Sequence, residues 1–360
     1  MEGFSRFWPQ ASIDAGSANR SVALQLWLLG ALAPVALMLS GEFGRFDFDS
    51  LWIAGKMALA GSASQIYDPD SIRSFAASLG LRGEMNFPYP PLGLLFVVPF
   101  ATLPHIPAYF AWNLATAGFF YWAARPYLPG GFPPILAILT PAALTCLDYG
   151  QTGLLFGGLW LLAFRGRWPA LALLSFKPHL GWLAVLSLRD WRSLAKTVAL
   201  GLALVGITMA IWGIWLWGDF VQHSIGHATE LGTAARKRWL FQGVGPAMAY
   251  GMIGWIPFAA AGGLLLARNV NAFTAATASF LISPYGFHYD MAVASLGFGL
   301  AIFRGWDEMP VKHRVPMALG FLSPVIALLG AWWVPPILLW ALWAQVKYAD
   351  PSVSSPPIVH

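Results

Sequence analysis

The stretch from Arg45 to Pro91 reads RFDFDSLWIAGKMALAGSASQIYDPDSIRSFAASLGLRGEMNFPYPP. It is polar and carries several carboxylates, whereas the segment before it and most of the chain after it are apolar enough for a membrane interior. We expect this stretch to be the first external loop of a multi-pass membrane protein, at about residues 41–91. A loop with so many carboxylates is expected to carry chemistry or to bind a ligand.

The composition supports a membrane protein. Hydrophobic residues make up 58% of the 360 residues and charged residues only 10%, against about 25% in a soluble domain. The 19 tryptophans suit the two membrane–water interfaces. The net charge of +5 lies in short loops, so it indicates topology and not a nucleic-acid partner. The single cysteine, Cys146, cannot form a disulfide within the chain.

Apolar runs divide the chain into ten to twelve expected membrane crossings, because a helix needs roughly 20 apolar residues to span a bilayer. Together they predict one all-α polytopic domain over residues 1–360. The run Leu92–Leu103 is short and closed by prolines, so we expect it to be re-entrant or interfacial. The other expected segments are Val22–Leu39, Ile106–Ala124, Pro134–Leu147, Thr152–Phe164, Trp168–Phe176, Leu180–Leu188, Leu194–Leu216, Pro246–Ala267, Ala272–Ile282, Met291–Phe303, Val315–Leu329 and Ile337–Ala344.

The charges predict the orientation. With both termini in the cytoplasm, the basic loops fall inside and most acidic residues fall outside. This holds only if the two half-length pieces around Lys177-Pro178 form a broken hairpin. The first external loop is expected to hold two short helices, Ser50–Ala60 and an amphipathic one capped by Asp70 and stopped by Gly80. A second external loop is expected at about 217–245.

Two aspartates, Asp47 and Asp49, are the first candidates for chemistry. An aspartate before a helix often caps it by accepting a backbone N–H bond. One aspartate meets that need, and a second carboxylate at a membrane–water boundary fits a general base that acts on a sugar hydroxyl. Capping and catalysis both remain open at this point.

Several cations and polar turns are further candidates. Lys177, at the break of the hairpin, needs a polar cavity or an anion, unless it snorkels to the interface. The segment Arg236-Lys237-Arg238 lies on the external side, against the positive-inside rule, which suggests a bound anion. The turn that contains His288 and Asp290 resembles part of a site, as does the turn with Gln151, although each also fits an ordinary polar turn.

A metal site and a nucleotide site are both disfavoured. His223 and His227 have the spacing of metal ligands on a helix, with Glu230 close behind. However, Gly226 interrupts them and no H-E-x-x-H motif is present. Phosphate-binding glycine loops and Walker motifs are also missing from the sequence. We therefore expect no metal and no other cofactor.

Four ordered segments make the chain resemble glycosyltransferase family 87, the polyprenyl-phosphate-dependent membrane transferases of GT-C type. The resemblance runs over roughly residues 45–300. Each motif alone is weak, but the ordered set is fairly specific. The segments are Asp47-Phe48 with Trp52, Ala54-Gly55, Gly61 and Tyr67-Asp68; Phe87-Pro88-Tyr89-Pro90-Pro91-Leu92 with Pro99 and Leu103-Pro104; Gly150-Gln151 with Lys177-Pro178-His179; and Ser283-Pro284 with Tyr289-Asp290.

The resemblance implies a GT-C-type bundle in a bacterial inner membrane that transfers a sugar on the external face. The donor would be a polyprenyl-phosphate hexose, with mannose the first expectation, and the acceptor a hydroxyl of a lipid or glycan. The transfer would be of inverting type and would need no nucleotide donor. The membrane and these two substrates are the expected partners.

The same resemblance assigns roles to residues. Asp47 falls on the proposed catalytic base, and Asp49 stays open because of the D-F-D spacing. Lys177 and His288 would contact the donor phosphate, with Arg236 and Arg238 as outer contacts. The motif residues Gln151, Tyr89 and Asp290 would line the substrate site.

Two other classes of function remain open from the sequence. A transporter of lipids or sugar-linked lipids is expected to place ionisable residues within several spans and to show internal symmetry. Here nearly all ionisable residues lie in loops, and no repeat is visible. A non-catalytic assembly subunit would tolerate the loss of both aspartates, whereas an enzyme would not.

Overall fold

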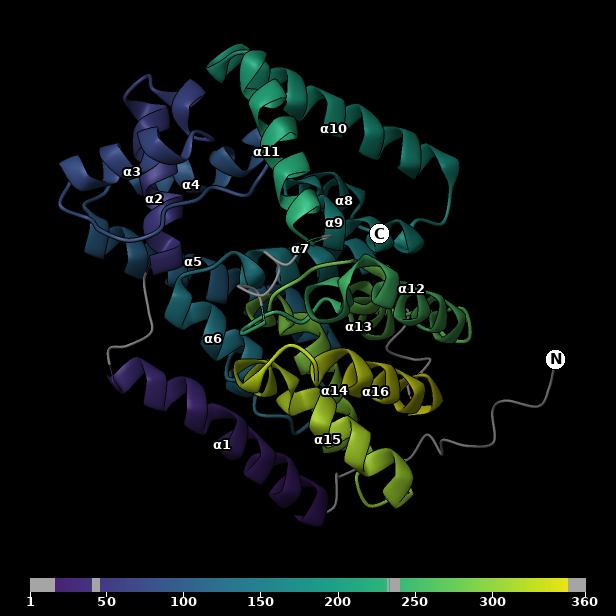
Figure 1. Cartoon of the computed structure of the whole chain (residues 1–360). Helices are drawn as coiled ribbons and strands as arrows, with labels where there is room; N and C mark the ends of the chain where they lie inside the picture. Colours follow the sequence, from purple (N-terminus) through teal and green to yellow (C-terminus); the bar gives the residue numbers. More distant parts are fainter. Residues whose placement is uncertain (1–16, 41–45, 232, 234–239, 349–360) are drawn as a thin grey trace.

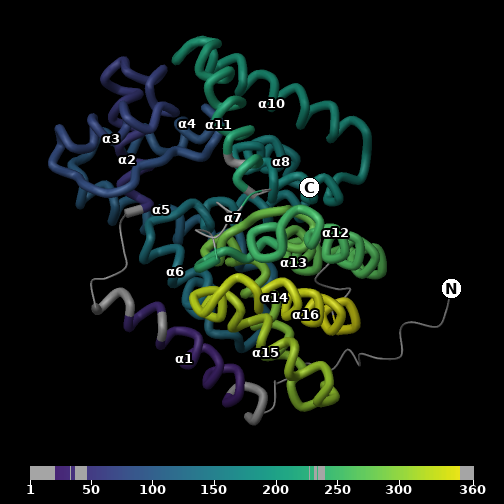
Figure 2. Tube along the Cα trace, viewed as in Figure 1, coloured from purple at the N-terminus to yellow at the C-terminus, as the bar shows by residue number. Residues whose placement is uncertain are grey.

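The structure of the chain is a computed structural model that describes residues 17–40, 46–231, 233 and 240–348. Sixteen α-helices, joined by turns and short 3-10 segments, make up these residues, and no strand is assigned among them. Figure 1 and Figure 2 show how the helices are arranged. The prediction of an all-helical membrane-type fold is confirmed.

The segment predicted as the first external loop folds into helices that pack on the bundle. Helix α2, Phe46–Leu59, begins four residues earlier than predicted, so that Asp47 and Asp49 lie in its first turn. It packs against α4, Leu94–Ala101, where Gly55 lets Ala101 approach closely. Helix α3, Pro69–Ser78, is capped by Asp68 and not by Asp70 as predicted, because the Asp68 carboxylate accepts a hydrogen bond from the Ser71 N–H at 3.0 Å.

A sharp bend follows the segment predicted as the first external loop. Residues Pro91–Ala101, which contain α4, and His105–Tyr127, which contain α5, His105–Ala124, meet at 117°. Pro104 precedes α5, and proline disfavours helical backbone before it. A broken span or a re-entrant loop has this geometry, which agrees with the interpretation of Leu92–Leu103.

The middle of the chain is broken into short helices. The segment predicted as one span, Pro134–Leu147, is instead a 3-10 turn followed by α6, Pro141–Tyr149, because Thr140 and Pro141 start a new helix. Helix α7, Gly153–Phe164, is continuous. Helices α8, Trp168–Leu173, and α9, Pro178–Gly181, flank Lys177, whose φ and ψ of −135° and 64° are not helical. The predicted break at Lys177-Pro178 is therefore present.

Two long helices follow, and together they lie above α8 and α9 in Figure 1. Helix α10, Trp191–Trp212, ends at Gly213, which has a φ of 94°. Helix α11, Trp215–Leu231, then occupies much of the segment predicted as an external loop at 217–245, and the position of that segment relative to the membrane stays a prediction. Helix α12 runs over Pro246–Leu266.

The remaining helices form the centre of the bundle. Helix α13, Ala272–Ile282, and helix α14, Ala292–Gly305, are buried along almost their whole length. Around them pack α15, Val311–Ile326, α16, Val334–Tyr348, and α1, Ser17–Ser40. Small residues permit close contact, since a Cβ on Gly299 would lie 2.2 Å from the Trp27 ring.

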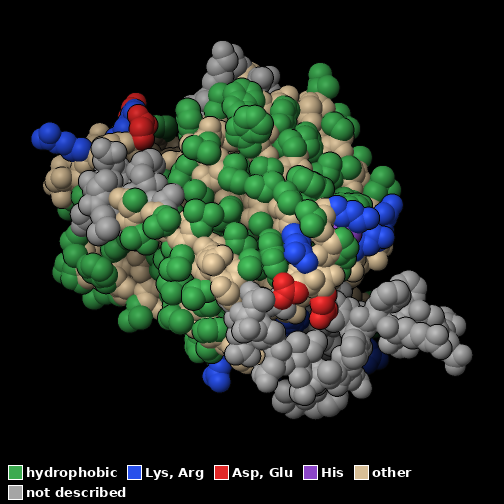
Figure 3. All heavy atoms as spheres, turned by 90° about the horizontal axis from the view of Figure 1, so that it is seen from below, with side chains coloured by type: hydrophobic (Ala, Val, Ile, Leu, Met, Phe, Trp, Pro, Cys, Tyr) green, Lys and Arg blue, Asp and Glu red, His purple; other side chains and the backbone are tan. Residues whose placement is uncertain are grey.

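The outer surface suits a membrane. Helices α10 and α12 are long and apolar enough to cross a bilayer, and the bent pair around Pro104 would make a third crossing. Apolar side chains cover most of the face seen in Figure 3, with basic groups toward its edges. Shorter apolar helices, such as α7, α13 and α14, fall below the length of a full span. The predicted number of crossings, ten to twelve, stays a prediction.

Candidate functional site

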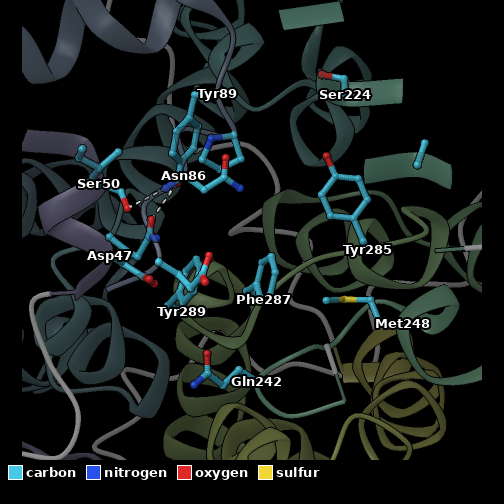
Figure 4. A pocket seen from close by; sticks show the side chains of 15 residues that line it. Asp47, Ser50, Asn86, Tyr89, Ser224, Gln242, Met248, Tyr285, Phe287 and Tyr289 are labelled. Atoms are coloured by element: carbon cyan, nitrogen blue, oxygen red, sulfur yellow. Dashed lines mark hydrogen bonds between the residues drawn. The ribbon is translucent and has the colours of Figure 1, made fainter. Parts of the chain in front are cut away.

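A cavity of about 310 Å³ opens between the start of α2, the 84–89 segment, the residue pair before α7, α11, the loop before α12 with the first turn of that helix, and the loop after α13 (Figure 4). Its lining combines aromatic rings with amide, hydroxyl and carboxylate groups. The lining residues are Asp47, Ser50, Leu51, Glu84, Asn86, Pro88, Tyr89, Gln151, Ser224, Ala228, Gln242, Met248, Tyr285, Phe287 and Tyr289. Such a lining, aromatic with a few placed polar groups, is typical of a small-molecule site.

Asp47 stands on the wall of this cavity and is half-buried. Burial raises the pKa of the Asp47 carboxyl above its usual value. A hydrogen bond with the Gln151 side chain and the positive charge of Lys177 oppose this rise, while the charges of Asp290 and Asp49 add to it. A carboxylate in a cavity with a raised pKa has the properties of a general base.

Asp49 is held in a different place, although it lies only two residues further on. Its carboxylate is buried and lies 2.6 Å from Nε2 of His105, the first residue of α5. The His105 ring also contacts the rings of Phe48 and Trp52. Asp49 does not line the cavity. Its contact therefore fastens α2 to α5.

Behind the cavity wall lies a buried ion pair. The Lys177 ammonium is 2.5 Å from Oδ1 of Asp290 and donates a hydrogen bond to the Thr152 hydroxyl at 2.9 Å. It also lies over the rings of Tyr89 and Tyr289, at 5.3 and 5.5 Å from their centroids. Neither Lys177 nor Asp290 lines the cavity. The ammonium expected to contact a phosphate is thus 5% exposed and already paired.

A chain of hydrogen bonds connects this ion pair to Asp47. The Tyr89 hydroxyl lies 3.0 Å from the Thr152 hydroxyl and donates to Oε1 of Gln151 at 2.8 Å. Burial raises the pKa of Tyr89 to about 12, so this hydroxyl keeps its proton. The Gln151 side chain in turn is hydrogen-bonded to Asp47. The positive charge of Lys177 is therefore coupled to the carboxylate on the cavity wall.

The close approach of α7 to the loop after α13 makes this network possible. A Cβ on Gly153 would lie 2.0 Å from the Tyr289 carbonyl oxygen, so only glycine fits there. Because Gly153 begins α7, the contact brings Thr152 and Asp290 to the same Lys177 ammonium.

His288 is buried beneath the cavity and supports the loop before α12. Its Nδ1 lies 3.0 Å from the Gln242 carbonyl oxygen, and its backbone N–H donates to the same oxygen at 3.1 Å. Burial lowers the pKa of His288 to about 4, so the imidazole is neutral near pH 7. His288 was expected to contact the phosphate, but a neutral ring outside the cavity lining does not supply positive charge there.

Gln242 is a cavity residue that the sequence does not reveal. Its backbone φ of 71° is unusual for a residue other than glycine. Its side-chain amide donates a hydrogen bond to the Tyr149 hydroxyl at 3.0 Å. An antiparallel bridge between Gly243 and Phe287 ties its loop to the segment after α13. Ser50, Asn86 and Ser224 were also missed as lining residues, whereas Tyr285 and Phe287 lie in the turn that was expected to form part of a site. Of these missed residues, Asn86 lies next to the Phe87–Leu92 motif and Ser50 next to Asp49, whereas Ser224 had no nearby signal.

The cations expected to meet the donor phosphate lie elsewhere. Arg236 and Arg238 fall outside the described residues. The described part of the cavity lining contains no lysine or arginine. Within the described residues, no three His, Cys, Asp or Glu side chains gather as a metal ion would require.

Comparison with known families gives one match. The model of glycosyltransferase family 87 matches residues 87–284, which is more than half of the chain. This range covers Tyr89, Gln151 and Lys177, whereas Asp47 and Asp290 lie outside it. Comparison with curated proteins and with solved structures gives no match. The chain therefore belongs to glycosyltransferase family 87 and is a membrane glycosyltransferase.

Proposed function

We propose that the chain transfers a hexose from a polyprenyl-phosphate donor to a hydroxyl of a lipid or glycan, with Asp47 as the general base. The observation that carries this proposal is the separation of the two aspartates. Asp47 borders the cavity, whereas Asp49 is fixed to His105. A base must reach the proton that it removes, and of these two carboxylates only that of Asp47 faces open space.

In the proposed reaction, the Asp47 carboxylate accepts the proton of the acceptor hydroxyl. The acceptor oxygen forms a bond to the anomeric carbon of the donor sugar. The bond between that carbon and the phosphate oxygen breaks, and its electron pair leaves with the polyprenyl phosphate. The cavity of about 310 Å³ lies near the lower end of the range for small-molecule sites, which suits one sugar ring with its reacting groups.

The lining supports a carbohydrate ligand. The stacked rings of Phe287 and Tyr289, with an interplanar angle of 11°, offer a flat apolar surface for a sugar ring. The amides of Asn86, Gln151 and Gln242 face the same cavity and can bond sugar hydroxyls. Mannose is the sugar to test first, because the family resemblance suggests it.

We further propose separate roles for Lys177, for the arginine pair and for His288. Lys177 acts through the hydrogen-bond chain and its field, keeping Asp47 ionised more readily than its burial alone would allow. Arg236 and Arg238 contact the leaving phosphate, since the described lining has no cation for that role. His288 positions Gln242 and stays neutral.

The proposed setting is a bacterial inner membrane, with the cavity open to the external side and both termini in the cytoplasm. The negatively charged residues of the first external loop and the basic turns at the other ends of the helices support this orientation.

A donor comparison tests the proposed reaction class. Purified protein in detergent receives labelled polyprenyl-phosphate mannose, polyprenyl-phosphate glucose or nucleotide-linked mannose, each with a total lipid extract as acceptor. We expect a new labelled lipid from a polyprenyl-phosphate sugar and none from the nucleotide sugar. Transfer from the nucleotide sugar alone would contradict the proposal.

A further inference from the structure

A second cavity, of about 850 Å³, runs along α7 from Leu155 to the turn that follows the helix. Gln151 and Thr152 immediately before α7 belong to the first site, and Arg165 and Gly166 immediately after it border the second. The 12 residues of α7 span about 18 Å. The two linings share no residue, and the end of the second cavity that holds Arg165 is about one helix length from the first site.

Hydrocarbon side chains form the walls of this cavity. Leu155, Leu159 and Leu162 follow one another along a single face of α7. Phe96 from α4 and Phe119 from α5 also line the cavity. Four of these five side chains are only half-buried by the protein, although each is apolar. The walls suit an alkyl chain and offer no partner for a polar ligand.

The lining beside these apolar side chains has the opposite character. Arg165 is half-buried and Arg167 is exposed, and they flank Gly166, whose φ of 78° makes the turn between α7 and α8. No Asp or Glu is among the residues that line the cavity. In the described part of the chain, neither guanidinium has a carboxylate within ion-pair distance.

Two tryptophans, Trp122 and Trp168, also line the cavity with the arginines. Trp122 is 55% exposed. Tryptophan beside arginine, next to an apolar region, is typical of the membrane–water interface. The positive-inside rule places the turn with Arg165 and Arg167 on the cytoplasmic side. The ligand that matches this arrangement has an anionic head and an alkyl tail, and it comes from the cytoplasmic leaflet.

We propose that this cavity binds an anionic phospholipid of the cytoplasmic leaflet. The phosphate lies between Arg165 and Arg167, whose planar guanidinium groups suit phosphate oxygens. One acyl chain lies along Leu155, Leu159 and Leu162. The site is independent of the transfer chemistry and would exist whichever sugar the enzyme uses.

Photo-crosslinking tests this proposal on the full-length protein. The protein is reconstituted in phosphatidylcholine vesicles with a small fraction of phosphatidylglycerol that carries a photoreactive acyl chain. Peptide mapping is expected to find the label on residues 155–162 of α7 and on α5 near Phe119. The double variant Arg165→Gln/Arg167→Gln is expected to lose labelling by about thirtyfold, since each arginine near an anionic surface contributes roughly a factor of five.

A matched control removes two exposed cations from the start of α10, as Arg192→Gln/Lys196→Gln. Its labelling is expected to equal that of the wild type. Unchanged labelling in the Arg165→Gln/Arg167→Gln protein would overturn the proposal, as would equal labelling of these sites by a phosphatidylcholine probe. Stronger labelling by a photoreactive polyprenyl phosphate that phosphatidylglycerol does not displace would also overturn it, because the cavity would then hold the chain of the donor.

A measurement on the unmodified wild type makes the test independent of variant folding. Excess unlabelled phosphatidylglycerol is expected to suppress labelling of residues 155–162, whereas the same excess of phosphatidylcholine is not. Equal suppression by both lipids would show that the groove does not select an anionic head group and would overturn the proposal.

Discussion

On the cavity wall, Asp47 is half-buried and faces open space, whereas directly behind that wall Asp49 and Asp290 are buried and paired with His105 and Lys177. The polar groups of the wall remain available to a ligand, whereas those of the layer behind it pair with one another. Changes in the paired layer should therefore act on the stability of the fold, and changes on the wall should act on the reaction.

The largest expected effect comes from Lys177→Met. This change leaves the Asp290 carboxylate buried without its partner, which should destabilise the fold by about 3–5 kcal/mol. Thermal unfolding in detergent measures the loss. The double variant Lys177→Met/Asp290→Leu removes both charges and should recover most of the stability. A single variant as stable as the wild type would show that the pair does not hold the layer together.

The next effect comes from Asp49→Asn. Loss of the charge-assisted contact with His105 should cost about 1–3 kcal/mol of stability. Turnover per folded molecule should stay close to that of the wild type, since Asp49 does not reach the cavity. His105→Asn should give a similar pair of results. A folded Asp49→Asn protein without activity would contradict the conclusion that Asp49 acts on the stability of the fold and not on the reaction.

A smaller effect is expected from Tyr89→Phe, which removes the hydroxyl that links Thr152 to Gln151. The loss of one hydrogen bond should cost about 0.5–1.5 kcal/mol. Gln151 is then held less firmly, and its hydrogen bond lowers the pKa of Asp47. The acid limb of the pH–rate profile should therefore move to higher pH. An unchanged acid limb would show that the hydrogen bonds through Tyr89 do not affect the pKa of Asp47.

The smallest effect concerns the stability of Asp47→Asn. Burial raises the pKa of Asp47, so the folded state binds a proton more tightly than the unfolded state. Ionised Asp47 therefore weakens the fold as the pH rises through its unfolded and then its folded pKa. Near pH 7 the neutral amide should make the protein slightly more stable. A lower unfolding temperature than that of the wild type would contradict this sign.

The sequence predicted the parts of the fold that depend on local chemistry. The break at Lys177-Pro178 follows from proline, and the end of the first loop helix follows from Gly61, which has a φ of 77°. Helix α11 was missed because its polar residues, including Asp219 and Glu230, made the segment resemble a loop. The nine-residue α6 was merged with its preceding turn, since apolar composition alone does not show where Pro141 restarts a helix.

The site was only partly predictable, for geometric reasons. Asp47 and Asp49 are two residues apart, and residues in a helix turn by about 100° each, so the two point to opposite sides of α2. The sequence could not say which side faces the cavity. Lys177 and Asp290 are 113 residues apart, and no local sequence pattern predicts their contact. Gln242 enters the cavity through an uncommon backbone conformation at an unremarkable position.

The central claim is that Asp47 is the base, and a comparison of Asp47→Asn with Asp49→Asn tests it most directly. Each purified variant receives a labelled polyprenyl-phosphate sugar and the acceptor extract, and turnover is normalised to folded protein. Asp47→Asn should lose about 10²- to 10⁴-fold in turnover, while Asp49→Asn keeps most of it. Full turnover in a folded Asp47→Asn protein would contradict the account.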